Sequence, residues 1–269
     1  MNAPGARFLR RMVEEVRDQV MRGAYDLGGQ REITPPAGER LASALTGGRR
    51  PGIMVELKHA SPGYRSAGLR TPDPERFVEL ARAGGAQALS VVPQDYRFGG
   101  SLREFAEVTR RSTLPVLFKD FILDPRQLRA ARRLGARAAL LLARLEREGG
   151  LLAPLATLVE EAHRVGLEAL VEVHQEEDVP LALAARPDLL GVNARDLETL
   201  ELDRDRALRT LHRARGCGVP LIGMSGIAGP EEVRAYLRAG ADGVLVGTRF
   251  LEAEDPVTFL RSLRVQEDP

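Results

Sequence analysis

The sequence predicts a single (β/α)8 TIM barrel with an extra N-terminal helix. Eight short apolar runs alternate with amphipathic segments along the 269 residues. That order is typical of a parallel sheet, and eight strands are the number that closes such a barrel. Several amphipathic segments end at glycine, as helices commonly do. Because nothing marks a domain boundary, residues 1–269 are expected to form one domain.

The predicted strands are runs rich in Val, Leu, Ile and Ala, as expected for strands buried on both faces. They cover residues 53–58, 86–92, 114–119, 137–143, 167–173, 188–193, 219–224 and 242–247. Successive strands start about 20–35 residues apart, which leaves room for one helix after each strand.

The segments between the strands have apolar residues at helical spacing. The predicted helices cover residues 74–83, 102–111, 126–134, 151–165, 176–185, 204–213, 230–239 and 256–263. Before the first strand, Phe8, Met12, Val16 and Val20 recur every four residues and predict a helix over 6–22. We expect residues 1–50, this helix and a Gly/Pro-rich connector, to pack on the barrel rather than on a membrane. The apolar face is modest, and acidic residues interrupt the polar face.

A doubly wound open sheet is the alternative fold. It would require a glycine-rich phosphate loop directly after the first strand. Residues 58–63 read Lys-His-Ala-Ser-Pro-Gly, which is not such a loop. The barrel is therefore the favoured prediction.

The composition narrows the function classes. The chain has 39 basic and 38 acidic residues, so its bulk charge favours neither nucleic acid nor a membrane as a partner. One cysteine cannot form a disulfide within the chain, and the four histidines lack metal-ligand spacing. The N-terminus has no signal-peptide core and no run reaches transmembrane length. We expect a cytoplasmic enzyme without a metal site.

Lysine is rare in this chain, and its two positions are informative. Only Lys58 and Lys119 are lysine among the 39 basic residues, and the others are arginine. An ammonium can be tuned by its surroundings to give up a proton, whereas a guanidinium stays charged. Each lysine closes an apolar run. Two chance lysines on a solvated face would be the usual interpretation, but the pattern here favours acid–base or carbonyl chemistry.

Further polar residues fall at the same ends of predicted strands. Glu56 shares a strand face with Lys58, Glu172 interrupts the fifth strand, and Asn193 ends the sixth with Arg195 just beyond it. Each alone could be an edge charge or a turn residue. Together they predict a site at the carboxyl ends of the strands, where barrel enzymes place their chemistry. Two nearby histidines are expected to support these groups or face solvent: His59 and His174.

Small residues follow the last two strands. Ser225-Gly226 comes after the seventh and Gly247-Thr248 after the eighth. Glycine-rich turns can be plain connectors, but barrel enzymes commonly bind phosphate at the loops after strands seven and eight. With two lysines and Arg195 nearby, we favour a small phosphorylated substrate.

Six segments together resemble one family, indole-3-glycerol phosphate synthase. They are residues 55–62, 88–91, 97–101, 117–121, 169–174 and 191–197. The matches follow the family's order, and the resemblance covers nearly the whole chain, N-terminal helix included. It implies a barrel fold and a place in tryptophan biosynthesis.

The resemblance also implies the reaction. The substrate would be the carboxyphenylamino-deoxyribulose phosphate made from anthranilate. Its aromatic carbon would attack the ribulose carbonyl, CO2 would leave, and loss of water would give an indole. No cofactor is implied. The expected partner is this phosphorylated small molecule, and the expected oligomeric state is a monomer or weak homodimer.

Residue roles follow from the same resemblance. Lys119 resembles the acid that protonates the carbonyl, and Glu172 resembles the acid–base partner for dehydration. Lys58 would hold the substrate carboxylate and can exchange acid roles with Lys119, while Glu56 would orient Lys58. The implied binding residues are Asn193 and Arg195 for the sugar, Ser225, Gly226, Gly247 and Thr248 for the phosphate, and Ser61, Pro62, Phe98, Phe121 and Leu140 for the ring.

The chain departs from the family pattern at several positions. The seventh strand usually ends Glu-Ser-Gly, and here Met224 replaces the glutamate. Phe118 stands where the family often has Arg, Ala194 where it often has Asn, and residues 63–65 replace a Ser-Lys-Gly turn. Losing an anion beside two ammonium groups should lower their pKa values. We therefore expect slow synthase activity that Met224→Glu would raise.

Two other functions remain open from the sequence. The first is a divergent barrel that acts on another phosphosugar, with Lys119 as a Schiff base. The second is a barrel that only binds a ligand or a partner protein. Met224 favours this last interpretation, and the lysines and glutamates at the predicted site argue against it.

Overall fold

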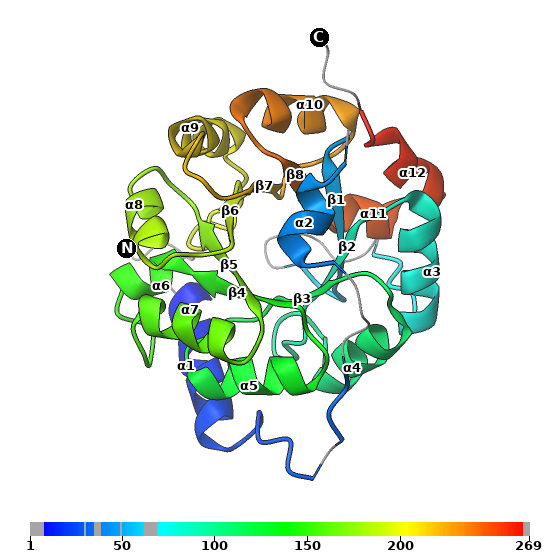
Figure 1. The fold of residues 1–269 in the computed structure, drawn as a ribbon. Helices are drawn as coiled ribbons and strands as arrows, with labels where there is room; N and C mark the ends of the chain where they lie inside the picture. The colour runs from blue at the N-terminus through cyan, green and yellow to red at the C-terminus, as the bar shows by residue number, and fades with distance from the viewer. Residues whose placement is uncertain (1–7, 30, 35–38, 49, 62–68, 266–269) are drawn as a thin grey trace.

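Eight parallel strands close into a barrel in the computed structural model (Figure 1). The structure describes residues 8–29, 31–34, 39–48, 50–61 and 69–265. Each strand pairs with the next along the chain, and β8 closes on β1. The strands are β1 Gly52–Leu57, β2 Ala88–Val91, β3 Val116–Phe118, β4 Ala138–Leu142, β5 Glu168–Val173, β6 Leu189–Asn193, β7 Leu221–Met224 and β8 Gly243–Val246. The predicted (β/α)8 barrel is therefore confirmed.

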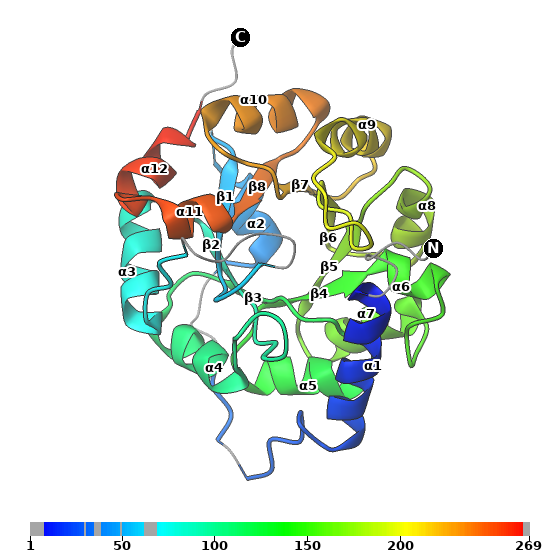
Figure 2. The same ribbon diagram turned by 180° about the vertical axis from the view of Figure 1, so that it is seen from behind.

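Helices surround the barrel and cover one of its ends (Figures 1 and 2). Those on the outside are α3 Pro74–Gly84, α4 Leu102–Arg111, α5 Pro125–Arg133, α7 Leu155–Arg164, α8 Asp178–Ala184, α9 Arg204–Ala214, α10 Pro230–Ala239 and α12 Pro256–Ser262. The others are α1 Phe8–Met21, α2 Leu41–Thr46, α6 Ala143–Arg147 and α11 Thr248–Glu252. No described helix is long and apolar enough to cross a membrane.

Strand alternation separates the core into two layers. Side chains at odd positions of β1, such as Val55 and Leu57, are buried beneath the outer helices, while Glu56 reaches the pocket inside the barrel. In the outer layer the ring of Phe118 packs edge-on against Phe105 of α4, with centroids 4.9 Å apart. The inner layer at the carboxyl ends includes the polar side chains Glu56 and Glu172.

The amino end of the barrel is covered by α2, which lies across the opening in Figure 1. Glu168, at the start of β5, accepts hydrogen bonds from the backbone N–H groups of Leu41 and Ala42. Gly52, at the start of β1, packs directly against α2: a Cβ at this position would lie 2.3 Å from the carbonyl oxygen of Leu45. The connector therefore contains a helix that the sequence did not predict, because six residues are too few to show a helical period.

The predicted N-terminal helix forms as α1. Its apolar stripe, Leu9, Met12, Val16 and Val20, is buried. The helix lies beside α5 (Figure 2), where Arg126 Nη1 donates to the carbonyl oxygen of Val20 at 3.5 Å.

Two further differences from the prediction concern helix boundaries. Short helices α6 and α11, five residues each, follow β4 and β8 where only loops were expected. The helix predicted over 151–165 begins at Leu155, directly after Pro154. Proline favours the first turn of a helix and disrupts its interior, so the four preceding residues stay outside α7.

Candidate active site

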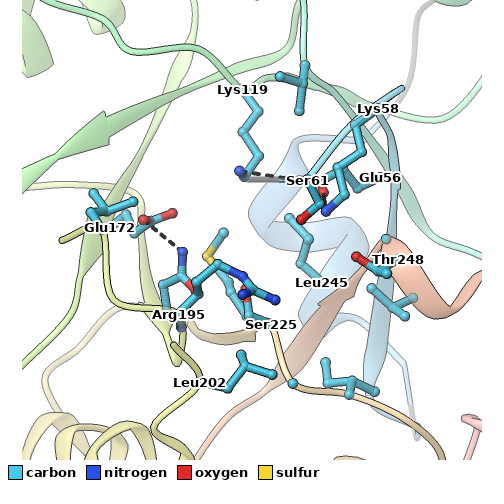
Figure 3. A pocket seen from close by; sticks show the side chains of 18 of the residues that line it. Glu56, Lys58, Ser61, Lys119, Glu172, Arg195, Leu202, Ser225, Leu245 and Thr248 are labelled. Carbon is cyan, nitrogen blue, oxygen red and sulfur yellow. Dashed lines mark hydrogen bonds and ion pairs between the residues drawn. The ribbon is translucent and has the colours of Figure 1, made fainter. Parts of the chain in front are cut away.

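One pocket at the carboxyl ends of the strands brings the predicted site residues together (Figure 3). The predicted residues that line it are Glu56, Lys58, Ser61, Phe98, Lys119, Phe121, Leu140, Glu172, Asn193, Arg195, Ser225, Gly226, Gly247 and Thr248. Pro62 lies outside the described residues. Strand ends far apart in sequence meet here because the barrel closes.

Glu56 joins the two lysines. Lys58 Nζ donates to Glu56 Oε1 at 2.5 Å, and Lys119 Nζ forms an ion pair with Glu56 Oε2 at 3.3 Å. The glutamate is only 3% exposed, whereas the lysine side chains are 13% and 20% exposed. One buried carboxylate thus holds two ammonium groups at the pocket wall, as Figure 3 shows.

The charges of this cluster are mutually stabilised. Burial alone would raise the pKa of Glu56, but Lys119 and Lys58 outweigh that effect and lower the pKa to about 2. Burial would likewise lower the pKa of Lys119, yet Glu56 and Glu172 raise it above its ordinary value. Lys119 is therefore an ammonium and Glu56 a carboxylate.

Glu172 faces this cluster from β5. Its Oε1 accepts a hydrogen bond from Asn193 Nδ2 at 3.0 Å and lies 3.1 Å from His174 Nε2. Burial would raise the pKa of Glu172, but the contacts with His174 and the charge of Lys119 lower it. Its buried Oε2 accepts no hydrogen bond from the described residues. Glu172 therefore has one oxygen held by Asn193 and one oxygen without a hydrogen-bond donor among the described residues.

Arg195 is fixed by its neighbours on the loop after β6. Its backbone N–H donates to Asn193 Oδ1 at 2.9 Å, and its Nη1 donates to the carbonyl oxygen of Leu200 at 2.6 Å. Asn193 therefore connects Glu172 with the loop that carries the guanidinium.

An apolar wall borders the pocket on the side of β2–β4. The rings of Phe98 and Phe121 are 6.3 Å apart and tilted by 38°. Leu140 continues the wall, and Ser61 is buried beside it. Such a surface fits a flat aromatic ring better than a polar sugar.

The opposite side carries small residues in unusual backbone conformations. Ser225 has φ +66° and Gly226 has φ +71°, and the Tyr236 hydroxyl donates to the carbonyl oxygen of Ser225 at 2.9 Å. A left-handed serine costs conformational energy and is a hint of function. At Gly247, a Cβ would lie 2.7 Å from Glu56 Oε1 and 3.2 Å from Lys58 Nζ. Glycine there leaves room for the ion pair.

The residues that depart from the family pattern lie in different places. Met224 lines the pocket and is 1% exposed. Its sulfur packs against Gly191, where an added Cβ would lie only 2.6 Å from it. Phe118 points to α4, away from the pocket. Ala194 is buried, and residues 63–65 lie outside the described part of the chain.

Several pocket residues were not predicted from the sequence, and aromatic and charged side chains from the chain's helices and loops are among them. These include Phe8 at the start of α1, Asp120 after β3 and Arg204 at the start of α9. Arg204 Nε lies 3.3 Å from where a Cβ on Gly226 would be, so this guanidinium lies beside the Ser225-Gly226 turn. In a chain so rich in arginine, nothing in its sequence context distinguishes it. Asp120 directly follows Lys119, and that adjacency was the available signal.

The fold and the site together define a class of protein: (β/α)8-barrel enzymes with a lysine–carboxylate pocket at the carboxyl face. Among the described residues, no cluster of three or more His, Cys, Asp or Glu side chains could hold a metal ion. The family model for indole-3-glycerol phosphate synthase matches residues 7–263. The chain belongs to the indole-3-glycerol phosphate synthase family, as the resemblance predicted.

Two similar proteins carry the same family name. Indole-3-glycerol phosphate synthase 2 of Streptomyces coelicolor is 43% identical over 236 residues, covering 85% of this chain and 86% of the relative. Indole-3-glycerol phosphate synthase of Mycobacteroides abscessus is 42% identical over 211 residues, covering 77% of this chain and 75% of the relative.

Solved structures of other barrels share the fold alone. A 3-hexulose-6-phosphate synthase superposes with a TM-score of 0.63 at 17% identity, covering 81% of this chain and 100% of that one. Thiamine phosphate pyrophosphorylase from Pyrococcus furiosus gives a TM-score of 0.59 at 20% identity, covering 83% and 96%.

Proposed function

We propose that this chain is an indole-3-glycerol phosphate synthase acting on 1-(2-carboxyphenylamino)-1-deoxyribulose 5-phosphate. A bond forms between the aromatic carbon that bears the carboxylate and the ribulose carbonyl carbon. The bond to the carboxylate then breaks and CO2 leaves. Loss of water gives indole-3-glycerol phosphate, and the whole sequence consumes one proton.

Lys119 is the proposed acid for ring closure. As the aromatic carbon attacks, negative charge develops on the carbonyl oxygen, and a positioned ammonium can transfer a proton to it. Glu56 and Glu172 keep Lys119 protonated by raising its pKa. A positioned acid of this kind contributes about 10²–10⁴-fold to the rate.

Lys58 is proposed to hold the substrate's carboxylate until CO2 leaves, with Glu56 as its anchor. Because Lys58 Nζ also lies over Gly247, the ammonium is within reach of the phosphate side of the pocket. It can therefore attract both anionic ends of the substrate and, by exchange with Lys119, deliver a proton. Glu56 lies between the two positive charges and partly balances them.

Glu172 is proposed to serve in dehydration. Its lowered pKa keeps it ionised, so it can accept the proton that the new five-membered ring must lose. The hydroxyl group needs a proton to leave as water, and a protonated Glu172 or Lys58 can supply one. Glu172 Oε2, which accepts no hydrogen bond from the described residues, is the oxygen proposed to exchange this proton.

The remaining pocket residues are proposed to bind the two ends of the substrate. The aryl group would lie on Phe98, Phe121 and Leu140, with Ser61 at the edge of this wall. The phosphate would bind at Ser225, Gly226, Gly247 and Thr248, with Arg204 as an added cation. Asn193 and Arg195 would contact the sugar hydroxyls. A phosphate anchored about one sugar away from the reacting carbon supplies binding energy that can orient it.

The single observation that carries this proposal is the bridge from Glu56 to both Lys58 and Lys119, opposite Glu172 in one pocket. The test is to incubate the purified chain with the adduct and identify the products by mass spectrometry. The proposal expects release of CO2 and a product lighter than the adduct by CO2 plus water. Recovery of unchanged adduct would overturn it.

Two further measurements, borohydride labelling and adduct binding, separate the alternatives. A divergent phosphosugar enzyme with Lys119 as a Schiff base would leave the adduct intact and become labelled at Lys119 when a ketose phosphate and borohydride are added. A barrel that only binds ligands would show saturable binding of the adduct without product or labelling.

A further inference from the structure

A tyrosine from the N-terminal segment reaches the residue beside the proposed acid. Tyr25 lies just after α1, and its hydroxyl donates to Asp120 Oδ2 at 2.6 Å. Tyr25 is 8% exposed and Asp120 is 3% exposed. A hydrogen bond between a buried hydroxyl and a buried carboxyl group is both strong and costly to break.

Asp120 lies between Lys119 and Phe121 in the chain, adds a negative charge near Lys119 and binds the backbone of Phe121. Its second oxygen, Oδ1, accepts from the backbone N–H of Phe121 at 2.8 Å. Gln127 Nε2 donates to the carbonyl oxygen of Phe121 at 3.0 Å and holds the other side of that residue. The carboxyl group of Asp120 therefore ties the hydroxyl of Tyr25 to the backbone that sets the direction of the Phe121 ring.

The same N-terminal segment also contacts the neighbouring loop after β2. Gln19 Nε2 donates to Asp95 Oδ1 at 3.0 Å, and Gln94 Nε2 donates to Gln19 Oε1 at 3.2 Å. This loop leads to Phe98, the partner of Phe121 in the apolar wall. The segment from Gln19 to Tyr25 thus touches both loops that carry the wall.

We propose that Tyr25 is a positioning residue that acts through Asp120 on Lys119 and Phe121. Its hydroxyl holds the Asp120 carboxyl group in place, and that group fixes the proposed acid on one side and the proposed ring wall on the other. This inference rests on the proposed function of the pocket.

The charges around Asp120 are consistent with this role. Asp120 is faced by Asp95 from the loop after β2, by Lys119, and by the hydroxyl of Tyr25; Lys119 in turn faces Glu56 and Glu172. Burial raises the pKa of Asp120, and the hydrogen bonds from Tyr25 and Phe121 oppose that rise. Without the hydroxyl, the carboxyl group would take up a proton more easily or turn toward the pocket.

The test replaces Tyr25 with phenylalanine, which removes only the hydroxyl. We expect kcat to fall about tenfold, because a small displacement of catalytic groups is costly to rate, and KM to rise less. Thr109→Val is the matched control. It also removes a buried hydroxyl, but that hydroxyl donates to the backbone carbonyl oxygen of Leu134, and neither Thr109 nor Leu134 lines the pocket.

A double-mutant cycle with Asp120→Asn tests the route. If Tyr25 acts through Asp120, Tyr25→Phe should change kcat by less than about twofold in the Asp120→Asn background. Two results would overturn the proposal. The first is that Tyr25→Phe has the same kcat and KM as Thr109→Val. The second is that Tyr25→Phe lowers kcat by the same factor in the Asp120→Asn background as in the wild type.

The proposed function and this inference can fail separately. A wild-type chain that forms no indole overturns the proposed function, whatever Tyr25 does. The positioning role is then read from binding of the adduct analogue in which the ketone is reduced to an alcohol. Tyr25→Phe should weaken its binding at least about threefold relative to Thr109→Val, and equal affinities would overturn the inference.

Discussion

Lys58 and Lys119 are partly buried and share one carboxylate, so each needs both its charge and its compact shape. Glu56 lies 2.5 Å from one ammonium and 3.3 Å from the other. A guanidinium is larger, planar and unable to donate its proton near neutral pH. The geometry explains why these two positions keep lysine in a chain that otherwise uses arginine.

Arginine at either position should therefore abolish most activity. We predict that Lys119→Arg and Lys58→Arg each lower kcat by at least about 10²-fold, the contribution of a positioned acid, with the fold retained. Arg103→Lys, at a side chain 88% exposed on α4, is the matched control and should change kcat little. Steady-state rates with the adduct are the measurement. Near-wild-type activity in either Lys→Arg variant would refute the acid–base interpretation.

Met224 occupies a position on the pocket wall from which a carboxylate could face the lysines. Met224→Glu should raise kcat, because an added anion stabilises both ammonium groups. Met224→Gln has nearly the same shape without the charge, so it separates electrostatics from packing. If the glutamate variant is no faster than the glutamine variant, a missing carboxylate does not limit this enzyme.

The strand β5 positions Glu172 together with the residues that hold it. Its inward-facing residues run from Glu168 at the amino end to Glu172 at the carboxyl end, with His174 one step beyond. Strand alternation places all three on one face. His174 contacts the oxygen of Glu172 that also accepts a hydrogen bond from Asn193, and the other oxygen accepts none from the described residues.

This arrangement makes a prediction for pH dependence. The pKa of Glu172 is lowered from its ordinary 4.5. The carboxylate therefore stays ionised at pH 4.5, and the activity that depends on it is lost only when the pH falls through the lowered pKa. His174→Asn removes the imidazole contact and raises the pKa of Glu172, so the acid limb of kcat/KM should move to higher pH. The exposed His212→Asn on α9 is the control. An unmoved acid limb in His174→Asn would rule out this role.

Periodicity predicted the long amphipathic helices and the apolar strands, since both patterns are local. The short helices α2, α6 and α11 were missed because five or six residues show too little of a period. Strand parity also placed Glu56 and Lys58 on one face. The pairing of Glu56 with Lys119, and of Tyr25 with Asp120, depends on barrel closure and on the path of the N-terminal segment, which no local pattern reveals.

For the whole molecule, the two ends of the barrel divide stability from chemistry. The carboxyl end holds the pocket, and the amino end is closed by α2 through the buried carboxylate of Glu168. Residues at the amino face of such barrels generally serve stability. Substitutions at the amino end should therefore lower the stability and leave kcat nearly unchanged. Substitutions in the pocket should lower kcat and change the stability less.

Glu168→Gln tests this division. It removes the charge that receives two backbone N–H groups and that pairs with Arg40, so the free energy of unfolding should fall by about 1–3 kcal/mol. The rate constant kcat at a temperature well below unfolding should stay within about twofold of wild type. Denaturant unfolding and steady-state assays measure both, with the exposed Glu160→Gln as control. A large loss of kcat without loss of stability would contradict the division.

The most direct measurement is indole fluorescence after the adduct is mixed with the wild-type chain, Lys119→Arg and Glu172→Gln in parallel. The protein contains no tryptophan, so an indole signal comes from the product. We predict a steady rise with the wild type and almost none with either variant. No rise with the wild type, or an equal rise in all three, would contradict the claim that this pocket carries out the synthase reaction.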